Sequence, residues 1–222
     1  MGVVVGDAAS QQMRQYLEQL LRWNRTYNLT AVRDPAEMRI QHLLDSLSVL
    51  PVLERLAANE NPNRPGCRIL DVGSGGGLPG VVIAIQQPGW QVTCVDAVAK
   101  KAAFVQQVAS VLRLPGLKAC HARVEELPPQ ACDVIISRAF ASLTDFVQLV
   151  SSHLAPGGRL VAMKGKYPHD ELADLARHSP GWRVESSETL AVTGLDAERC
   201  VLVLAPPASD STAISSEFSD RD

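Results

Sequence analysis

The chain has 222 residues, of which 46% are hydrophobic, and carries a formal net charge of −3. This length favours one domain with an elaboration at either end, since domains usually hold about 100 to 200 residues. The longest apolar runs, such as residues 134–136 and 201–204, fall far short of the roughly 20 residues that span a bilayer, so we expect no membrane protein.

Neither the start of the sequence nor its cysteines indicate secretion. The first ten residues contain no basic segment followed by an apolar stretch and a cleavage site, so we expect no secretory signal. The five cysteines are widely spaced, without a CxxC pair, and most lie in apolar surroundings. A reducing cytoplasm fits this pattern best.

The net negative charge of the chain comes from its C-terminal end. Residues 205–222 hold four carboxylates and one arginine, which leaves 20 acidic and 20 basic residues in the rest of the chain. A neutral body neither excludes a nucleic-acid site nor indicates one.

The N-terminal quarter is predicted to be helical. Apolar residues at spacings of three and four predict a helix over residues 10–28 and a second that begins near Pro35. Pro51 is expected to kink or end the second helix. His42 and Asp45 share one face of it, and a packing or capping pair is favoured there over a functional site. The Asn- and Pro-rich residues 59–66 read as the join to the main domain.

From residue 67 onward the sequence predicts alternating strands and helices. Five apolar segments of strand character lie at residues 67–73, 90–97, 117–124, 132–140 and 159–165. Helical patterns separate most of them, at residues 78–87, 99–114 and 143–153. Pro156, Gly157 and Gly158 predict a turn before the fifth strand. A helix over 170–177 and two strands over 182–190 and 199–204 complete the series.

This alternation predicts an α/β fold with a seven-stranded, mostly parallel sheet covered by helices on both faces. Ligands of such sheets bind at the carboxyl ends of the strands. We expect a flexible N-terminus over residues 1–9, a helical extension packed on the core over 10–65, the core over 66–205, and a disordered acidic tail over 206–222.

A glycine-rich loop follows the first strand. Residues 73–80 read GSGGGLPG, and glycines permit positive φ and close approach of a ligand to the backbone. A phosphate-binding P-loop needs Lys-Ser or Lys-Thr after the last glycine, but Val81 follows Gly80. The dinucleotide pattern GxGxxG is met literally by Gly75, Gly77 and Gly80, a weak signal by itself, and a plain glycine-rich turn is a further alternative.

Two acidic residues favour S-adenosylmethionine as the ligand. Asp71 opens the pattern Asp-x-Gly-x-Gly-x-Gly, and a carboxylate at this strand end suits the ammonium and sulfonium charges of that cofactor, directly or through water. A capping aspartate before a turn is the alternative. Asp96 ends the second strand, where an acid accepts both hydroxyls of a ribose. A nicotinamide enzyme would share Asp96 but would need a larger substrate-binding region than this chain has left.

Six ordered segments resemble one family. They are WNRTYNLT at 23–30, HLLDSL at 42–47, DVGSGGGLPG at 71–80, SRAF at 137–140, KG at 164–165 and LDAER at 195–199. The chain resembles the glucose-inhibited division protein B family, the 16S ribosomal RNA guanine-N7 methyltransferases, from about residue 10 to 205. The resemblance implies a Rossmann-like class I methyltransferase core that uses S-adenosyl-L-methionine and acts on one guanine near the decoding region.

The resemblance also implies a set of site residues. With Asp71, the expected cofactor-binding residues are Gly73, Gly75, Gly77, Leu78, Asp96, Ala97, Val98, Val124, Glu125 and Arg138. The expected RNA-binding residues are Lys100, Arg123, Lys164 and Lys166. Arg138 would position cofactor and substrate, with no general base. Ala97 departs from a frequent serine and so removes a possible hydroxyl contact.

The expected partner is 16S ribosomal RNA or the small ribosomal subunit, and the expected state is a cytoplasmic monomer. The histidines and cysteines show no metal-ligand spacing, so no metal is expected. Two alternatives stay open at this point: a small-molecule methyltransferase, and a non-catalytic adenosyl-binding regulator of an RNA partner.

Overall fold

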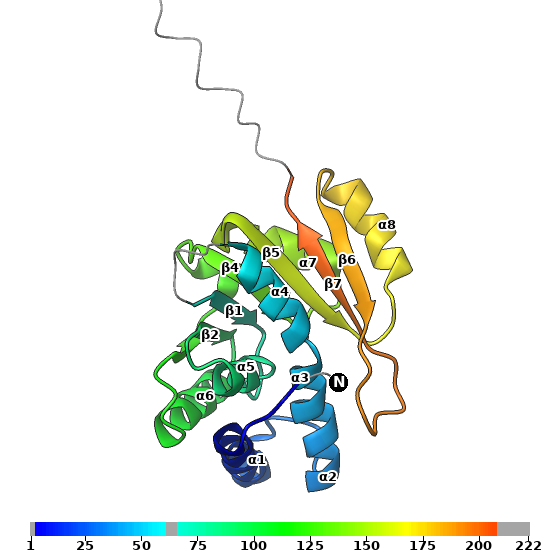
Figure 1. The fold of residues 1–222 in the computed structure, drawn as a ribbon. Helices are drawn as coiled ribbons and strands as arrows, with labels where there is room; N and C mark the ends of the chain where they lie inside the picture. The colour runs from blue at the N-terminus through cyan, green and yellow to red at the C-terminus, as the bar shows by residue number, and fades with distance from the viewer. Residues whose placement is uncertain (1–2, 61–65, 208–222) are drawn as a thin grey trace, which may run out of the picture.

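The structure is a computed structural model that describes residues 3–60 and 66–207. Seven strands form one sheet in the order β3-β2-β1-β4-β5-β7-β6 (Figure 1). The strands are β1 Arg68–Val72, β2 Gln91–Asp96, β3 Leu117–His121, β4 Cys132–Ser137, β5 Leu154–Lys164, β6 Arg183–Thr189 and β7 Cys200–Ala205. Only β7 runs against its neighbours β5 and β6 among the described strands. The predicted seven-stranded, mostly parallel sheet is confirmed.

Helices cover both faces of the sheet. Those of the core are α5 Gly80–Gln86, α6 Ala99–Val111, α7 Leu143–Val150 and α8 His169–His178, with short 3₁₀ turns η2 Val124–Glu126 and η3 Ser151–His153. Because side chains alternate along a strand, Ile136 packs into the core beneath α5 and α6, while Ile135 packs into a second core beneath α7 and α8. In Figure 1, α7 lies behind the sheet.

The N-terminal helix α1, Asp7–Tyr27, begins three residues before the predicted boundary. Val3 and Val5 are partly buried against the core, and the Gln86 side-chain amide donates to the Val4 carbonyl at 2.6 Å. The expectation of a flexible N-terminus over residues 1–9 did not foresee these contacts, since a short valine-rich segment carries no helical pattern.

The second helical stretch is divided into four pieces. They are α2 Pro35–Met38, the π-helical turn η1 Arg39–Leu44, α3 Asp45–Ser48 and α4 Leu50–Glu60. The Asp34 carboxylate caps α2 by accepting from the Glu37 N–H at 2.9 Å. Pro51 does not end the helical stretch: it lies in the first turn of α4, directly after the break at Val49 between α3 and α4, and its missing N–H costs no hydrogen bond there. In Figure 1, α4 lies in front of the sheet.

A predicted turn proves to be a bulge. Pro156, Gly157 and Gly158 lie within β5. The residues of β5 that pair with β4 advance from Leu154 to Arg159, while β4 advances only from Cys132 to Val134. Gly157 has a φ of 85°, which a glycine adopts without strain, so the extra residues bend the strand and do not end it.

Two predictions fall partly outside the described residues: most of the predicted tail, at 208–222, and most of the predicted join, at 61–65. No helix in the described ranges is both long and apolar enough to cross a membrane.

Candidate active site at the carboxyl edge of the sheet

Two cavities lie at the edge where the parallel strands end. The first, of about 310 Å³, lies beyond β1, β2 and β3, beside the glycine loop. The second, of about 330 Å³, lies beyond β4 and β5, where the antiparallel β7 begins. The segment that follows β4 contributes to both, with Ala139 and Phe140 in the first cavity and Arg138 in the second.

The glycine loop has a geometry that side chains would prevent. Gly73, Gly75 and Gly77 all have positive φ, of 70°, 59° and 85°. A Cβ on Gly80 would lie 2.4 Å from the Cys94 sulfur, so only a glycine allows the start of α5 to approach the sheet this closely. The loop is therefore fixed both by its φ angles and by its packing.

Asp71 holds this loop from beneath. Its side chain is fully buried, and one carboxylate oxygen accepts from the Gly80 N–H at 2.8 Å and lies 3.8 Å from the Cys94 thiol. Burial raises the pKa of Asp71 from its ordinary 3.8 to about 7. Asp71 does not line either cavity, so the structure gives it the capping role that was the alternative in the sequence. Its contact with the cofactor stays a prediction.

Helix α1 also contacts the glycine loop. The Tyr16 hydroxyl donates to the Gly76 carbonyl at 2.7 Å, and Leu20 packs 3.2 Å from where a Gly76 Cβ would stand. Both side chains are fully buried, and burial raises the pKa of Tyr16 well above its usual range. The N-terminal extension is thus part of the machinery that shapes the loop.

Asp96 connects the glycine loop to the end of β2. Its two carboxylate oxygens accept from the Gly75 and Val98 N–H groups, each at 2.9 Å, and the Lys101 ammonium lies 3.7 Å away. Each oxygen keeps a further lone pair, so the carboxylate can still accept hydroxyls from a ligand in the first cavity.

The first cavity fits an adenosyl group. Apolar side chains of Val72, Val95, Val124, Phe140 and Leu149 form its walls, and Asp96 and Glu125 add the two carboxylates that can accept from hydroxyl or amino groups. An apolar cleft with few polar groups is the usual form of a nucleoside site. S-adenosylmethionine would therefore be held by the glycine loop, Asp96 and this wall.

Replacing Asp96 with alanine should weaken S-adenosylmethionine binding by about 1.5–3 kcal/mol, the usual range for a hydrogen bond to a charged group. Titration calorimetry on the folded variant measures the loss. Asp174→Ala removes an exposed carboxylate of α8 and serves as the control. Unchanged affinity in Asp96→Ala would exclude the ribose role.

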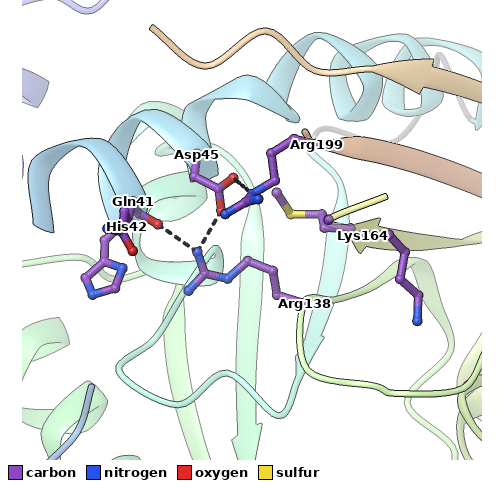
Figure 2. A pocket seen from close by; sticks show the side chains of 8 residues that line it. Gln41, His42, Asp45, Arg138, Lys164 and Arg199 are labelled. Atoms are coloured by element: carbon purple, nitrogen blue, oxygen red, sulfur yellow. Dashed lines mark hydrogen bonds and ion pairs between the residues drawn. The ribbon is translucent and has the colours of Figure 1, made fainter. Parts of the chain in front are cut away.

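A buried carboxylate organises the second cavity. One oxygen of Asp45 accepts from Arg138 Nη1 at 2.8 Å, and the other accepts from Arg199 Nε at 2.9 Å (Figure 2). The Asp45 side chain is 3% exposed, whereas those of Arg138 and Arg199 are 27% and 25% exposed. One buried carboxylate therefore holds two partly exposed guanidinium groups from segments far apart in the chain.

The π-helical turn η1 adds a second acceptor for Arg138. Directly after it, the Asp45 N–H donates to the carbonyls of Ile40 and His42 and not to that of Gln41, its partner in a regular α-helix. The Gln41 carbonyl accepts instead from Arg138 Nη1 at 3.2 Å. The wider turn thus frees a backbone acceptor for an arginine of the site.

His42 lies in this cavity too, and burial lowers its pKa below the ordinary 6.5. One ring nitrogen bonds to the Thr30 hydroxyl at 2.9 Å. His42 is thus neutral at physiological pH.

The predicted cofactor residues fall into three groups. Gly73, Asp96, Ala97, Val124 and Glu125 line the first cavity, as does Arg123 from the predicted RNA-binding set. Asp71, Gly77 and Leu78 are buried behind it, with Gly75 half-buried in the loop, and Val98 is exposed outside it. Arg138 lies in the second cavity.

The predicted RNA-binding lysines differ in exposure. Lys100 and Lys166 are exposed. Lys164 is only 11% exposed, and its ammonium donates to the Phe140 carbonyl at 2.8 Å and to Glu171 at 2.7 Å. Because this charge is paired, Lys164 is better placed to fix the Phe140 segment than to bind a phosphate.

Sequence reasoning weighed a site role for Asp45 without favouring it, and it did not single out Arg199 or Phe140. All three lie in segments that carried the family resemblance, HLLDSL, LDAER and SRAF. Their common position in those segments was the available signal.

Among the residues that the structure describes, no group of three His, Cys, Asp or Glu side chains is arranged to hold a metal ion.

Comparison with known proteins identifies the family of the chain. Residues 9–202 match the family described as rRNA small subunit methyltransferase G, GidB. The chain belongs to this family. Relatives of that name are 55% identical in Bordetella avium, over 91% of this chain and 87% of the relative, and 58% identical in Bordetella pertussis, over 88% and 85%. The predicted family is confirmed.

Solved structures support the fold. A putative class I S-adenosylmethionine-dependent methyltransferase from Listeria monocytogenes has a TM-score of 0.65 at 15% identity, over 90% of this chain and 69% of that chain. Magnesium protoporphyrin IX methyltransferase from Synechocystis, with bound S-adenosylmethionine, has a TM-score of 0.56 at 19% identity, over 93% and 100%. At these identities the likeness shows the fold, and the predicted class I architecture is confirmed.

Proposed function

We propose that this protein methylates N7 of one guanine in 16S ribosomal RNA, near the decoding region, with S-adenosylmethionine as the methyl donor. The observation that carries the proposal is the pair of cavities that meet at Arg138, Ala139 and Phe140, one shaped for an adenosyl group and one lined by cations. The names of relatives more than 50% identical support ribosomal RNA as the substrate class.

The chain supplies positioning and not proton transfer. When bound, S-adenosylmethionine supplies a methyl group that is already activated by its sulfonium. Guanine N7 offers an in-plane lone pair and carries no proton that must leave first. The glycine loop and Asp96 would hold the cofactor. The segment that contains Arg138 lies between the two cavities. Alignment and the exclusion of water are what remains for the protein to provide.

We expect single-turnover methyl transfer, with RNA and cofactor saturating, to be nearly independent of pH between about 6 and 9. His42 is the only histidine that lines the second cavity as described, and its lowered pKa keeps it neutral over most of this window. Quenched-flow measurement of labelled methyl transfer tests this, and Arg138→Ala should lower the rate while leaving the profile flat. A rate that climbs tenfold per pH unit and levels near 7 would contradict this expectation, and a climb that persists in Asp71→Asn would come from an essential base and not from Asp71, whose pKa is about 7.

Transfer of tritiated methyl groups tests the function itself. Small ribosomal subunits and naked 16S RNA from cells that lack the gene are the substrates, and the labelled nucleotide is mapped afterwards. Label in a small molecule alone would favour a small-molecule methyltransferase, and cofactor binding without transfer would favour a regulatory module. A ribosomal RNA substrate also implies a cytoplasmic enzyme, and one complete site per chain supports a monomer.

A further inference from the structure

Arg199 has hydrogen-bonding capacity that the fold does not use. Its Nε donates to Asp45 at 2.9 Å and its Nη1 to the Glu198 carbonyl at 2.8 Å. A guanidinium has five N–H donors in a planar fork, and within the described part of the chain the Nη2 group has no hydrogen-bond partner. A quarter of the Arg199 side chain is exposed, and it lines the second cavity, where Figure 2 shows it beside Asp45, as well as two neighbouring cavities next to β6 and β7.

The charge of this cavity suits an anion. Three cations line it, Arg138, Lys164 and Arg199, against the single carboxylate of Asp45. The ammonium of Lys164 is paired with Glu171, so the uncompensated positive charge belongs to the two arginines. A carboxylate that accepts from both fixes their positions without cancelling their combined charge.

We propose that Arg199, held in place by Asp45, binds a backbone phosphate of the RNA at the target nucleotide. The inference rests on the proposed function and deepens it. A planar guanidinium matches phosphate oxygens geometrically. The base is the less suitable partner, because methylation at N7 leaves a positive charge on the guanine ring, and a fixed cation beside that ring would oppose the transfer.

The position of Arg199 distinguishes RNA from cofactor. Arg138 follows β4 directly and adjoins the first cavity through Ala139 and Phe140. Arg199 precedes β7, on the far side of β5 from β4, and takes no part in lining the first cavity. The carboxylate of the cofactor is therefore the alternative partner for Arg138, while Arg199 faces the substrate side.

Equilibrium binding of a 16S RNA fragment to the full chain, measured over a range of salt concentrations, tests the proposal. Arg199→Ala should weaken RNA binding about 10- to 100-fold and flatten the log–log salt slope by about 0.7–0.9, the effect of one lost phosphate contact. Arg199→Lys keeps the charge and should keep most of the slope. Arg183→Ala removes an exposed arginine at the opposite edge of the sheet and should leave both quantities unchanged.

Kinetics and a double-mutant cycle test the positioning role of Asp45. In methyl transfer, Arg199→Ala should raise KM for RNA more than it lowers kcat, because a phosphate contact is equally strong before and during transfer. Asp45→Asn should weaken RNA binding in the wild-type background and much less in Arg199→Ala, since it acts partly through that arginine.

Two results would overturn the inference. One is RNA affinity and salt slope in Arg199→Ala equal to those of the wild type. The other is an equal loss of S-adenosylmethionine affinity, measured by calorimetry, which would assign Arg199 to the cofactor carboxylate. A wild-type enzyme that binds RNA but transfers no methyl group would refute the proposed function and leave the phosphate contact to be judged by the binding data.

Discussion

Replacing Asp45 with alanine should destabilise the protein by about 3 kcal/mol. Removing one partner of a buried ion pair costs about 3–5 kcal/mol, because the remaining charge is left without compensation. Here two guanidinium groups lose their shared partner, and they then repel each other across the second cavity. Since a quarter of each arginine side chain already reaches solvent, water compensates part of the loss and the lower end of the range applies.

Thermal unfolding measures this effect. For a chain of this size, about 3 kcal/mol corresponds to a fall in Tm of roughly 6–12 °C. The matched control is Asp174→Ala, which breaks a pair whose side chains are 68% and 52% exposed and should change Tm very little. A Tm equal to that of the wild type in Asp45→Ala would mean that the triad of Asp45, Arg138 and Arg199 makes no net contribution to the free energy of unfolding.

The sheet could be predicted because its determinants are local. Each strand is a short apolar run bounded by turn residues, and the alternation with helices leaves few topologies. The glycine loop could be predicted equally well, because Gly73, Gly75 and Gly77 have positive φ and each of these positions favours glycine by itself. The bulge at Gly157 could not be predicted, because a Pro-Gly-Gly segment indicates a change of direction without showing whether the same strand continues beyond it.

The triad could not be predicted because its members are far apart in sequence. Asp45 meets Arg138 across 93 residues and Arg199 across 154. Three segments of the family resemblance, HLLDSL, SRAF and LDAER, indicated that these residues matter and gave no sign that they meet in one cavity. Their convergence follows from topology: β4 ends, and the antiparallel β7 begins, at the same edge of the sheet.

Two further predicted site residues have contacts within the protein that the sequence did not show, and their roles toward cofactor and RNA stay predictions. Lys164 was assigned to RNA as a basic residue at a strand end, but Glu171 on α8 pairs with it, and that contact depends on how α8 packs. Asp71 was assigned to the cofactor, but Gly80 brings the start of α5 close enough to bond it. In both cases the residue type was the same in either role, and only the three-dimensional surroundings separate them.

The buried position of Asp71 predicts a pH-dependent stability. Its pKa is about 7 in the folded protein, chiefly through burial, and 3.8 is the ordinary value that applies to the unfolded chain. Between these values the folded state binds the additional proton, so the contribution of Asp71 to stability is greatest below about pH 4 and falls as the pH rises toward 7. The Gly80 N–H, the charge of Arg138 and the Cys94 thiol oppose the shift and are outweighed.

Asp71→Asn should remove this contribution. A shift of about three pKa units corresponds to about 4 kcal/mol at most, fully developed above pH 7. An asparagine oxygen can still accept from the Gly80 N–H, while the side chain cannot ionise. The variant should therefore match the wild type only below about pH 4, and its stability relative to the wild type should rise by about 3 kcal/mol between pH 5 and pH 8, as measured by urea unfolding without cofactor at several pH values. Other titrating groups are common to both proteins and cancel in the difference. If the stability difference between variant and wild type is the same at pH 5 and pH 8, Asp71 stays ionised beneath the loop, and a group that compensates its charge must lie closer than Arg138.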